Sequence, residues 1–256
     1  MTTGSARQSK QTGQGYFLTG TDTGVGKTAI TAALGRALQE RRLTIGLMKP
    51  VETGVHASRS YCSDTQKLHT ISPEQSIESV NQFQFPDPLA PLAAARAQGG
   101  KQCVDITVIQ TAYHGLSQTC DYTLVEGIGG VMVPLTQTLS VRDLIQALRI
   151  PSIVVGRTTL GGVNHLQLTI KSLRSRHIPI VAIVLNDGIF NHASENSIKQ
   201  RDSTIDLIQE LSGLPVFGPI AYQAELSDQW EVGISKLKQQ APIQQLGDFL
   251  MAEMQK

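Results

Sequence analysis

Gly20-Thr-Asp-Thr-Gly-Val-Gly-Lys-Thr28 separates an apolar run from an amphipathic stretch, and this segment decides the fold. Residues 16–20 are predicted to form a buried strand, and residues 28–40 a helix, because apolar residues recur there at helical spacing. A glycine-rich turn ending in Gly-Lys-Thr between a strand and a helix is typical of a phosphate-binding loop (P-loop). In such a loop Lys27 reaches the β- and γ-phosphates, and the Thr28 hydroxyl is a ligand of Mg²⁺. The sequence therefore predicts binding of a nucleoside triphosphate.

The loop departs from the strict G-x-x-x-x-G-K-[ST] pattern at one position. That pattern requires its first glycine at Thr21, whereas this chain has it one residue earlier, at Gly20. Partition and division-site ATPases carry a second lysine four residues before the second glycine, a position that Asp22 occupies here. The alternative is a strand-to-helix turn that binds nothing. The Gly-Lys-Thr sequence in its context favours nucleotide binding, and Asp22 disfavours a partitioning role.

Short apolar runs alternate with helical patterns along the remaining chain. Further strands are expected at 44–49, 122–126, 152–156, 180–185 and 215–220, and helices at 64–69, 92–97, 105–116, 140–148, 164–176, 198–211 and 242–254. Strands buried on both faces and separated by helices form mainly parallel sheets. We expect a disordered leader over residues 1–15. Residues 16–256 are expected to form a single α/β domain with a P-loop NTPase fold, a mainly parallel sheet of about seven strands flanked by helices.

Composition disfavours several classes of protein. Hydrophobic residues make up 40% of the 256 residues, and the formal net charge is +1 without a concentrated basic run, so no nucleic-acid partner is expected. The longest apolar runs are too short for a membrane span, and no secretory signal stands at the start, so a cytoplasmic location is expected. Cys62, Cys103 and Cys120 are dispersed, which is typical of reduced thiols rather than disulfides or a zinc site.

Four separated segments resemble the dethiobiotin synthetase family. They are the loop at 20–28, Lys49-Pro-Val-Glu-Thr-Gly54, Val125-Glu-Gly-Ile-Gly-Gly130 followed by Pro134-Leu135, and Arg157-Thr-Thr-Leu-Gly-Gly-Val-Asn-His165. The family forms of the last three are K-P-V-x-[ST]-G, V-E-G-A-G-G-x-x-x-P-L and R-T-x-L-G-x-I-N-H. The resemblance covers residues 16–190, and it is specific because all four segments occur in order between predicted strands.

The resemblance implies an ATP- and Mg²⁺-dependent ligase of biotin synthesis. In the family, one amine of 7,8-diaminononanoate takes up CO₂, supplied as bicarbonate, to form a carbamate, and ATP phosphorylates this carbamate. The other amine then closes the cyclic urea of dethiobiotin with loss of phosphate. Such a site must hold two anions, the carbamate and the γ-phosphate, close together, so it needs cations. The resemblance also implies a homodimer with composite sites.

The resemblance assigns roles to individual residues. Catalytic roles fall to Lys49, Lys27 and Thr23, and the Mg²⁺ ligands are Thr28, Asp64 and Glu126. Nucleotide-binding residues are Gly24, Val25, Gly26, Lys27, Thr28, Ala29, Asp64, Glu126 and Asn186, the last for adenine. Substrate-binding residues are Thr53, Gly129, Gly130, Leu160, Gly161 and Asn164, of which the last three serve the substrate carboxylate of the partner subunit. From the residues alone, the alternative role for Asp64, and likewise for Asn164, is a helix cap, and for Asp64 the metal role is favoured.

Three positions depart from the family pattern. Ile128 replaces the usual Ala, and Ala90 and Leu92 replace the Ser and His of P-x-S-P-H-x-A-A. These departures concern substrate contacts and leave open an inactive homologue. Two further alternatives are a P-loop nucleotide switch and a related amide-forming ligase such as the cobyrinic acid diamide synthases, which carry an additional glutamine-hydrolysing domain. Lys49-Pro-Val-Glu-Thr-Gly54 and the lack of a second loop lysine disfavour the switch, and the presence of every predicted charged catalytic residue favours an active synthetase.

Overall fold

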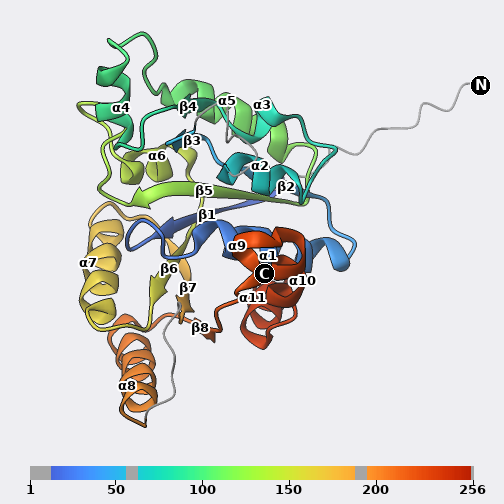
Figure 1. Ribbon diagram of the computed structural model, residues 1–256, viewed down its shortest axis with the longest axis vertical. Helices are drawn as coiled ribbons and strands as arrows, with labels where there is room; N and C mark the ends of the chain where they lie inside the picture. Colours follow the sequence, from blue (N-terminus) through green and yellow to red (C-terminus); the bar gives the residue numbers. More distant parts are fainter. Residues whose placement is uncertain (1–12, 56–62, 188–194, 255–256) are drawn as a thin grey trace, which may run out of the picture.

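A parallel six-stranded sheet forms the centre of the computed structural model, which describes residues 13–55, 63–187 and 195–254 (Figure 1). The strand order is β2-β5-β1-β6-β7-β8. The strands are β1 (Gln14–Gly20), β2 (Ile45–Met48), β5 (Tyr122–Gly130), β6 (Ser152–Arg157), β7 (Ile180–Asn186) and β8 (Val216–Ile220). Every neighbouring pair is parallel, which confirms the predicted α/β class and P-loop NTPase type of fold. The expected number of about seven strands was wrong for the main sheet of the described residues.

Pro50 explains why the next strand along the chain leaves the main sheet. Proline has no N–H to donate to a sheet, and it follows the end of β2. The chain then forms β3 (Val51–Thr53), which pairs in parallel with β4 (Phe83–Phe85) as a separate two-stranded sheet. The Lys49 N–H group donates instead to the Val80 carbonyl oxygen at 2.7 Å. Sequence analysis predicted no strand at either of these two positions.

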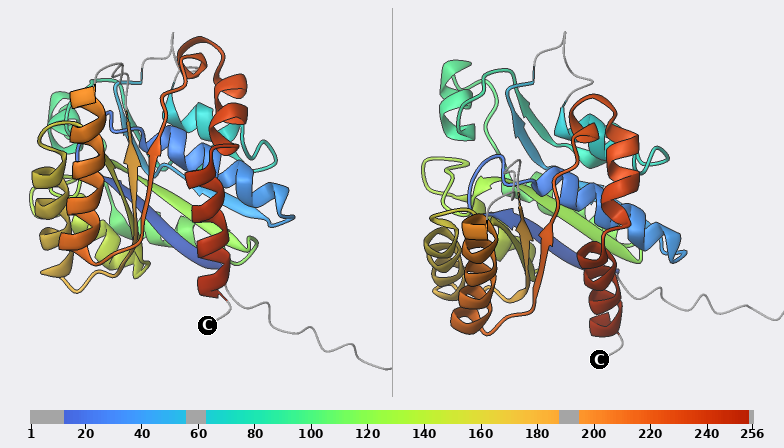
Figure 2. Two further views of the ribbon diagram at one scale, coloured as in Figure 1. Left: turned by 90° about the horizontal axis from the view of Figure 1, so that it is seen from below. Right: turned by 60° about the horizontal axis from the view of Figure 1, so that its bottom comes forward.

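Helices cover both faces of the main sheet, because successive strand residues point to opposite sides. Tyr16 and Leu18 of β1 lie in one buried cluster, whereas Phe17 lies in the other. The first cluster is covered by α1 (Lys27–Glu40), α2 (Asp64–His69), α3 (Ile77–Val80), α10 (Trp230–Lys238) and α11 (Ala241–Met254). The second is covered by α4 (Pro91–Ala97), α5 (Ile106–Ser117), α6 (Val141–Leu148), α7 (Gly162–Arg174) and α8 (Glu195–Ser212). Figure 2 shows α7 beside α8 on one side, and α10 and α11 beside α1 on the other.

All helices predicted from the sequence are present, with ends shifted by a few residues. Asp105, the first residue of the predicted helix 105–116, caps α5, since its Oδ1 atom accepts the Thr107 N–H at 2.8 Å. Sequence analysis did not foresee α3, α10 or the short helix α9 (Glu225–Asp228). No helix of the described residues is long and apolar enough to cross a membrane.

The beginning of the chain is only partly described. β1 begins at Gln14, so the last two residues of the expected leader belong to this strand, and residues 1–12 lie outside the described ranges. Cys62 also lies outside them, so the reduced state of the three cysteines stays a prediction.

Candidate active site

The loop between β1 and α1 has a backbone that requires glycine. Gly24 and Gly26 have φ angles of 70° and 97°, in the left-handed region that other residues rarely adopt. A Cβ atom at Gly26 would also lie 2.2 Å from the Asn186 side-chain nitrogen. α1 begins at Lys27, directly after this turn, so the N-terminal N–H groups of the helix face the loop. The segment thus has the strand-loop-helix arrangement that binds phosphate.

Lys27 is buried within the loop, and its Nζ atom donates to the Asp22 carbonyl oxygen at 3.0 Å. Burial lowers the pKa of Lys27 to about 8, and the nearby charge of Lys49 acts in the same direction. A negatively charged phosphate next to Lys27 would stabilise its ammonium form. The side chain is therefore suited to bind an anion at neutral pH.

Lys49 lies in a cluster of opposite charges at the carboxyl end of β2. Its Nζ atom is 2.6 Å from Glu126 Oε1 and 3.1 Å from Asp64 Oδ2, and it donates to the Gly127 carbonyl oxygen at 3.2 Å. Burial alone would lower the pKa of Lys49, but Glu126 and Asp64 raise it above its ordinary value. The two carboxylates therefore favour the charged form of Lys49 at the edge of the sheet where parallel α/β folds bind ligands.

Three oxygen-bearing side chains meet beside the loop. Thr28 Oγ1 donates to Glu126 Oε1 at 2.8 Å. The Asp64 carboxylate forms an ion pair with Lys49, which also pairs with Glu126. Burial raises the pKa of Glu126, whereas the charge of Lys49 lowers that of Asp64 against the effect of its burial. Glu126 Oε2 is buried and has no hydrogen-bond partner, so it is an oxygen that a cation can bind. Mg²⁺ prefers such hard oxygen ligands, and the residues fit this ion.

The loop, the lysine cluster and the C-terminal part of the chain enclose one pocket of about 510 Å³. Its lining comprises Thr23, Gly24, Gly26, Lys27, Thr28, Ala29, Lys49, Glu52, Thr53, Asp64, Lys67, Glu126, Ile128, Gly129, Leu226, Ser227 and Trp230. The pocket therefore brings together all three predicted catalytic residues and all three predicted metal ligands. Ile128, which departs from the family pattern, faces this pocket rather than the core alone.

Two predicted nucleotide-binding residues lie under or beside the loop rather than in the pocket lining. Val25 is buried, and the Asn186 side chain at the end of β7 donates to the Val25 carbonyl oxygen at 3.2 Å. Asn186 therefore supports the loop directly. Sequence analysis predicted only a contact with adenine for this residue.

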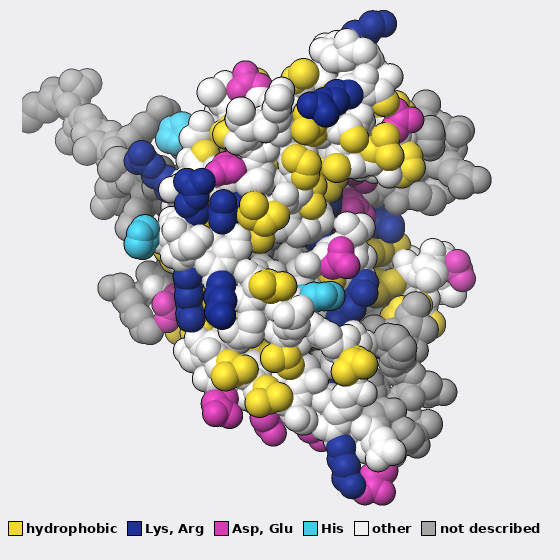
Figure 3. All heavy atoms as spheres, turned by 90° about the vertical axis from the view of Figure 1, so that its left-hand side faces the viewer, with side chains coloured by type: hydrophobic (Ala, Val, Ile, Leu, Met, Phe, Trp, Pro, Cys, Tyr) yellow, Lys and Arg dark blue, Asp and Glu magenta, His cyan; other side chains and the backbone are white. Residues whose placement is uncertain are grey.

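The remaining predicted substrate residues lie outside this pocket. Gly130 lines a neighbouring pocket of about 420 Å³ together with Met132 and Leu168. Leu160, Gly161 and Asn164 lie at the start of α7, where Leu160 is 91% exposed. Hydrophobic side chains lie among charged ones on the face of the molecule that carries α7 (Figure 3).

The two alternative helix caps are wrong. Ser63 caps α2, because its Oγ atom accepts the Gln66 N–H at 3.1 Å, so Asp64 is free to contact Lys49. α7 begins at Gly162 after Gly161, which places Asn164 inside the helix. The other departures from the family pattern lie at α4: Ala90 directly precedes it, and the Leu92 N–H donates to the Pro134 carbonyl oxygen.

Several residues of the site had no role predicted from the sequence. Arg157 donates to the Gly24 carbonyl oxygen at 2.8 Å and to that of Thr23 at 3.4 Å. Lys67 lies over the Trp230 ring, 5.1 Å from its centre, and joins α2 to α10 beside the pocket. The sequence contained two indications of these roles. Trp230 is the only tryptophan of the chain, and Arg157 begins one of the four segments that resemble the family.

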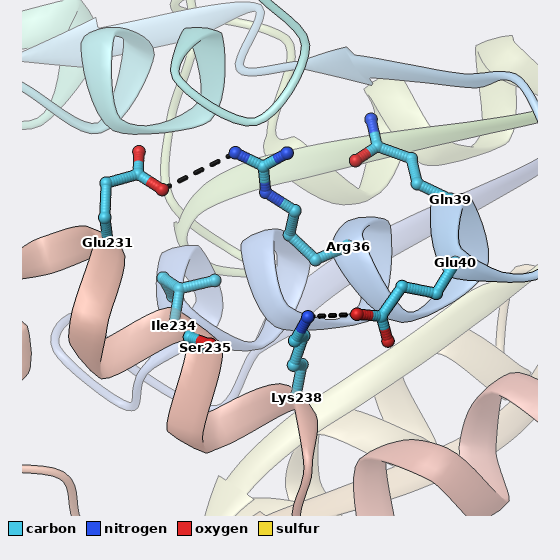
Figure 4. A pocket seen from close by; sticks show the side chains of 7 residues that line it. All are labelled: Arg36, Gln39, Glu40, Glu231, Ile234, Ser235 and Lys238. Carbon is cyan, nitrogen blue, oxygen red and sulfur yellow. Dashed lines mark hydrogen bonds and ion pairs between the residues drawn. The ribbon is translucent and has the colours of Figure 1, made fainter.

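A separate pocket of about 490 Å³ lies between α1 and α10 (Figure 4). Arg36 pairs with Glu231 at 3.5 Å, and Lys238 pairs with Glu40. Each of these ion pairs joins α1 to α10, so they help to hold α10, and with it Trp230, beside the nucleotide loop.

Comparison with known proteins identifies close and distant relatives. A family model described as an AAA domain matches residues 14–229. The ATP-dependent dethiobiotin synthetase BioD of Thermodesulfovibrio yellowstonii is 36% identical over 223 residues, which are 83% of this chain and 90% of the relative. The BioD protein of Bacillus cereus is 32% identical over 241 residues, covering 93% and 96%. That of Anaeromyxobacter dehalogenans is 42% identical over 174 residues, covering 68% and 76%.

Solved structures of similar fold include the MinD cell division protein of Aquifex aeolicus. Its TM-score is 0.58 at 15% identity, covering 95% of this chain and 98% of that one. The MinC:MinD complex from the same organism gives 0.57 at the same identity. These similarities show the fold alone. The similarity to BioD proteins extends over most of both chains, and the chain belongs to the ATP-dependent dethiobiotin synthetase family.

Proposed function

We propose that this chain forms dethiobiotin from 7,8-diaminononanoate, CO₂ and ATP, with Mg²⁺. The observation that carries the proposal is the convergence of Lys27 and Lys49 in one pocket with Thr28, Asp64 and Glu126. A carbamate and a triphosphate repel each other, and two lysines within one partly enclosed pocket offset that repulsion. The family's ATP-dependent activity agrees with this use of the pocket.

The P-loop holds the triphosphate in this proposal. The N–H groups of residues 24–29 face the phosphate oxygens, and Lys27 contacts the γ-phosphate. Thr28, Asp64 and Glu126 hold Mg²⁺, which when bound offsets negative charge on the phosphates. Glu126 Oε2, buried and without a hydrogen-bond partner, supports this assignment. Asn186 contacts the adenine and supports the loop from behind.

The reaction then takes place between Lys27 and Lys49. A carbamate oxygen attacks the γ-phosphorus and ADP leaves, so that the carbamate becomes a mixed anhydride. The second amine attacks the carbonyl carbon, releasing phosphate and a proton and closing the cyclic urea. Lys49 orients the carbamate and stabilises the negative charge, while Thr23, Thr53 and Gly129 surround the reacting groups.

A homodimer completes the site in this proposal. The exposed residues Leu160 (91%), Met132 (58%) and Leu168 (60%) offer apolar area on and beside α7, and burying such area drives association. Gly130 binds the substrate next to this area. The start of α7, with Gly161 and Asn164, would then contact the substrate carboxylate bound to the partner subunit, since a helix N-terminus favours anions.

The test is product formation in the presence of both small-molecule substrates. Incubation of the protein with Mg²⁺, ATP, 7,8-diaminononanoate and bicarbonate should release phosphate and give dethiobiotin, identified by its mass. Omission of the diamine or bicarbonate should stop both. Nucleotide binding without turnover would favour a nucleotide switch or an inactive homologue instead. The cytoplasm supplies ATP and bicarbonate, and we propose that residues 16–256 act there as one domain.

A further inference from the structure

Glu52 forms a set of contacts that the proposed chemistry does not use. Its side chain is buried, with 6% of the residue exposed, although it stands beside the active-site pocket. Its Oε1 atom accepts the Asp64 N–H at 2.6 Å. Its Oε2 atom accepts the Thr65 N–H at 3.1 Å and the Thr65 hydroxyl at 2.5 Å. Both carboxylate oxygens are therefore occupied by donors from the first two residues of α2.

These contacts fix the beginning of α2 against β3. The N–H groups at a helix start lack partners within the helix and need acceptors from elsewhere. Glu52 supplies acceptors for Asp64 and Thr65, and Ser63 supplies one for Gln66. Glu52 precedes Asp64 by 12 residues, so the hydrogen bonds join two segments that are distant in the sequence. A buried charged acceptor gives stronger hydrogen bonds than a neutral one.

The contacts of Glu52 determine the position of Asp64. Glu52 binds the Asp64 backbone, whereas the Asp64 side chain contacts Lys49 in the active-site pocket. Asp64 Oδ2 lies 3.1 Å from Lys49 Nζ, opposite Glu126. The Asp64 side chain is 35% exposed, so neighbouring packing alone leaves it room to move. Its position depends on where the first turn of α2 stands.

We propose that Glu52 is a positioning residue that holds Asp64 in place for Mg²⁺ and Lys49. The proposal rests on the proposed function in one respect, namely the assignment of Asp64 to the metal. Residues that orient a metal ligand typically change metal affinity about 10- to 100-fold when they are removed. Glu52 is then neither a ligand itself nor a contact of the diamine.

The experiment measures the Mg²⁺ dependence of nucleotide binding. The probe is the non-hydrolysable β,γ-imido analogue of ATP, titrated by calorimetry over a range of Mg²⁺ concentrations. In Glu52→Ala, the Mg²⁺ concentration for half-maximal binding should rise roughly tenfold or more. Glu52→Gln keeps one acceptor and should fall between Glu52→Ala and the wild type, and Thr65→Val should have a smaller effect. Glu78→Gln, an exposed glutamate in the first turn of α3, is the matched control and should have none.

A double variant separates positioning from a general loss of structure. In the Asp64→Asn background, Glu52→Ala should cause no further change in Mg²⁺ dependence, because its effect passes through Asp64. An equal effect in both backgrounds would overturn the proposal, as would an unchanged Mg²⁺ dependence in Glu52→Ala. A rise only in the KM for the diamine would assign Glu52 to substrate binding instead. Dethiobiotin formation by the wild type is measured in parallel, so failure of the proposed function is seen separately while the Mg²⁺ titration still tests Glu52.

Discussion

Lys49 and Glu126 form a buried ion pair, with 2.6 Å between Nζ and Oε1 and side-chain exposures of 4% and 0%. Lys49 directly follows β2, and Glu126 lies in the neighbouring strand β5, one residue beyond the last pair of the two strands, Met48 and Val125. Glu126 also accepts the Thr28 hydroxyl, so the pair joins the lysine to the nucleotide loop. The cation that would orient the carbamate and the carboxylate that would bind the metal are thus a single structural unit.

Loss of one partner should therefore affect stability as well as activity. Lys49→Met leaves Glu126 buried without its cation, which should lower the free energy of unfolding by about 3 kcal/mol or more. Lys49→Met combined with Glu126→Gln should recover part of that stability, because no buried charge is left unpaired, yet it should remain inactive. Urea denaturation and phosphate release measure the two effects. Equal stability of Lys49→Met and the wild type would contradict the coupling.

The pH dependence of nucleotide binding should reveal Lys27. In the free protein its pKa is lowered to about 8, and bound phosphates would raise it. Binding at pH 8 should therefore take up roughly half a proton, and affinity should fall as the pH rises through 8 and the free lysine becomes neutral. Calorimetry in buffers of different ionisation enthalpy measures this uptake. Lys27→Arg, whose guanidinium stays charged, should show none; uptake of the same size in this variant would assign the proton to another group.

Arg157 should determine how well the loop is formed before nucleotide binds. It donates to the Gly24 carbonyl oxygen, and in a trans peptide the Val25 N–H then points the opposite way. Arg157→Ala should weaken MgATP binding about five- to tenfold, corresponding to about one hydrogen bond, and Arg157→Lys should weaken it less. Titration calorimetry measures the change, with the exposed Arg96→Ala as the control. Unchanged affinity in Arg157→Ala would remove this role.

Mixed variants should test the composite site. Lys49→Ala removes the cation from the protomer that carries it, whereas Asn164→Asp adds a negative charge at the start of α7, where the partner's substrate carboxylate would bind. Each variant alone should be nearly inactive. Random exchange of the two should restore about a quarter of the wild-type activity, because half of the dimers are mixed and each has one intact site. Recovery should be absent when either variant is mixed with itself, and no recovery in the mixture would argue for sites within single protomers.

The sequence contained most of the fold and part of the site. Long apolar strands and the loop at 20–28 depend on local patterns, and the structure confirmed them. β3 was missed because its partner begins some thirty residues later, with Val51 beside Phe83, and short strands acquire their conformation from such distant contacts. The role of Glu52 was hidden for the same reason, since a sequence does not tell which backbone N–H groups a buried carboxylate will meet.

Only the family resemblance predicted that Lys49, Glu126 and Asp64 lie close together. Their positions in the chain, 49, 64 and 126, do not by themselves indicate contact. Trp230 and α10 had no prediction, because α10 spans only nine residues, Trp230–Lys238, and so short a segment gives a weak helical pattern.

The most direct test follows oxygen from bicarbonate into the products. If a carbamate oxygen attacks the γ-phosphorus between Lys27 and Lys49, reaction with ¹⁸O-labelled bicarbonate should give phosphate that carries one ¹⁸O atom and dethiobiotin that carries another in its urea. Both products should disappear in Lys49→Ala. Phosphate without the label, with its new oxygen coming from water instead, would mean that the site hydrolyses ATP without activating a carbamate and would contradict the account.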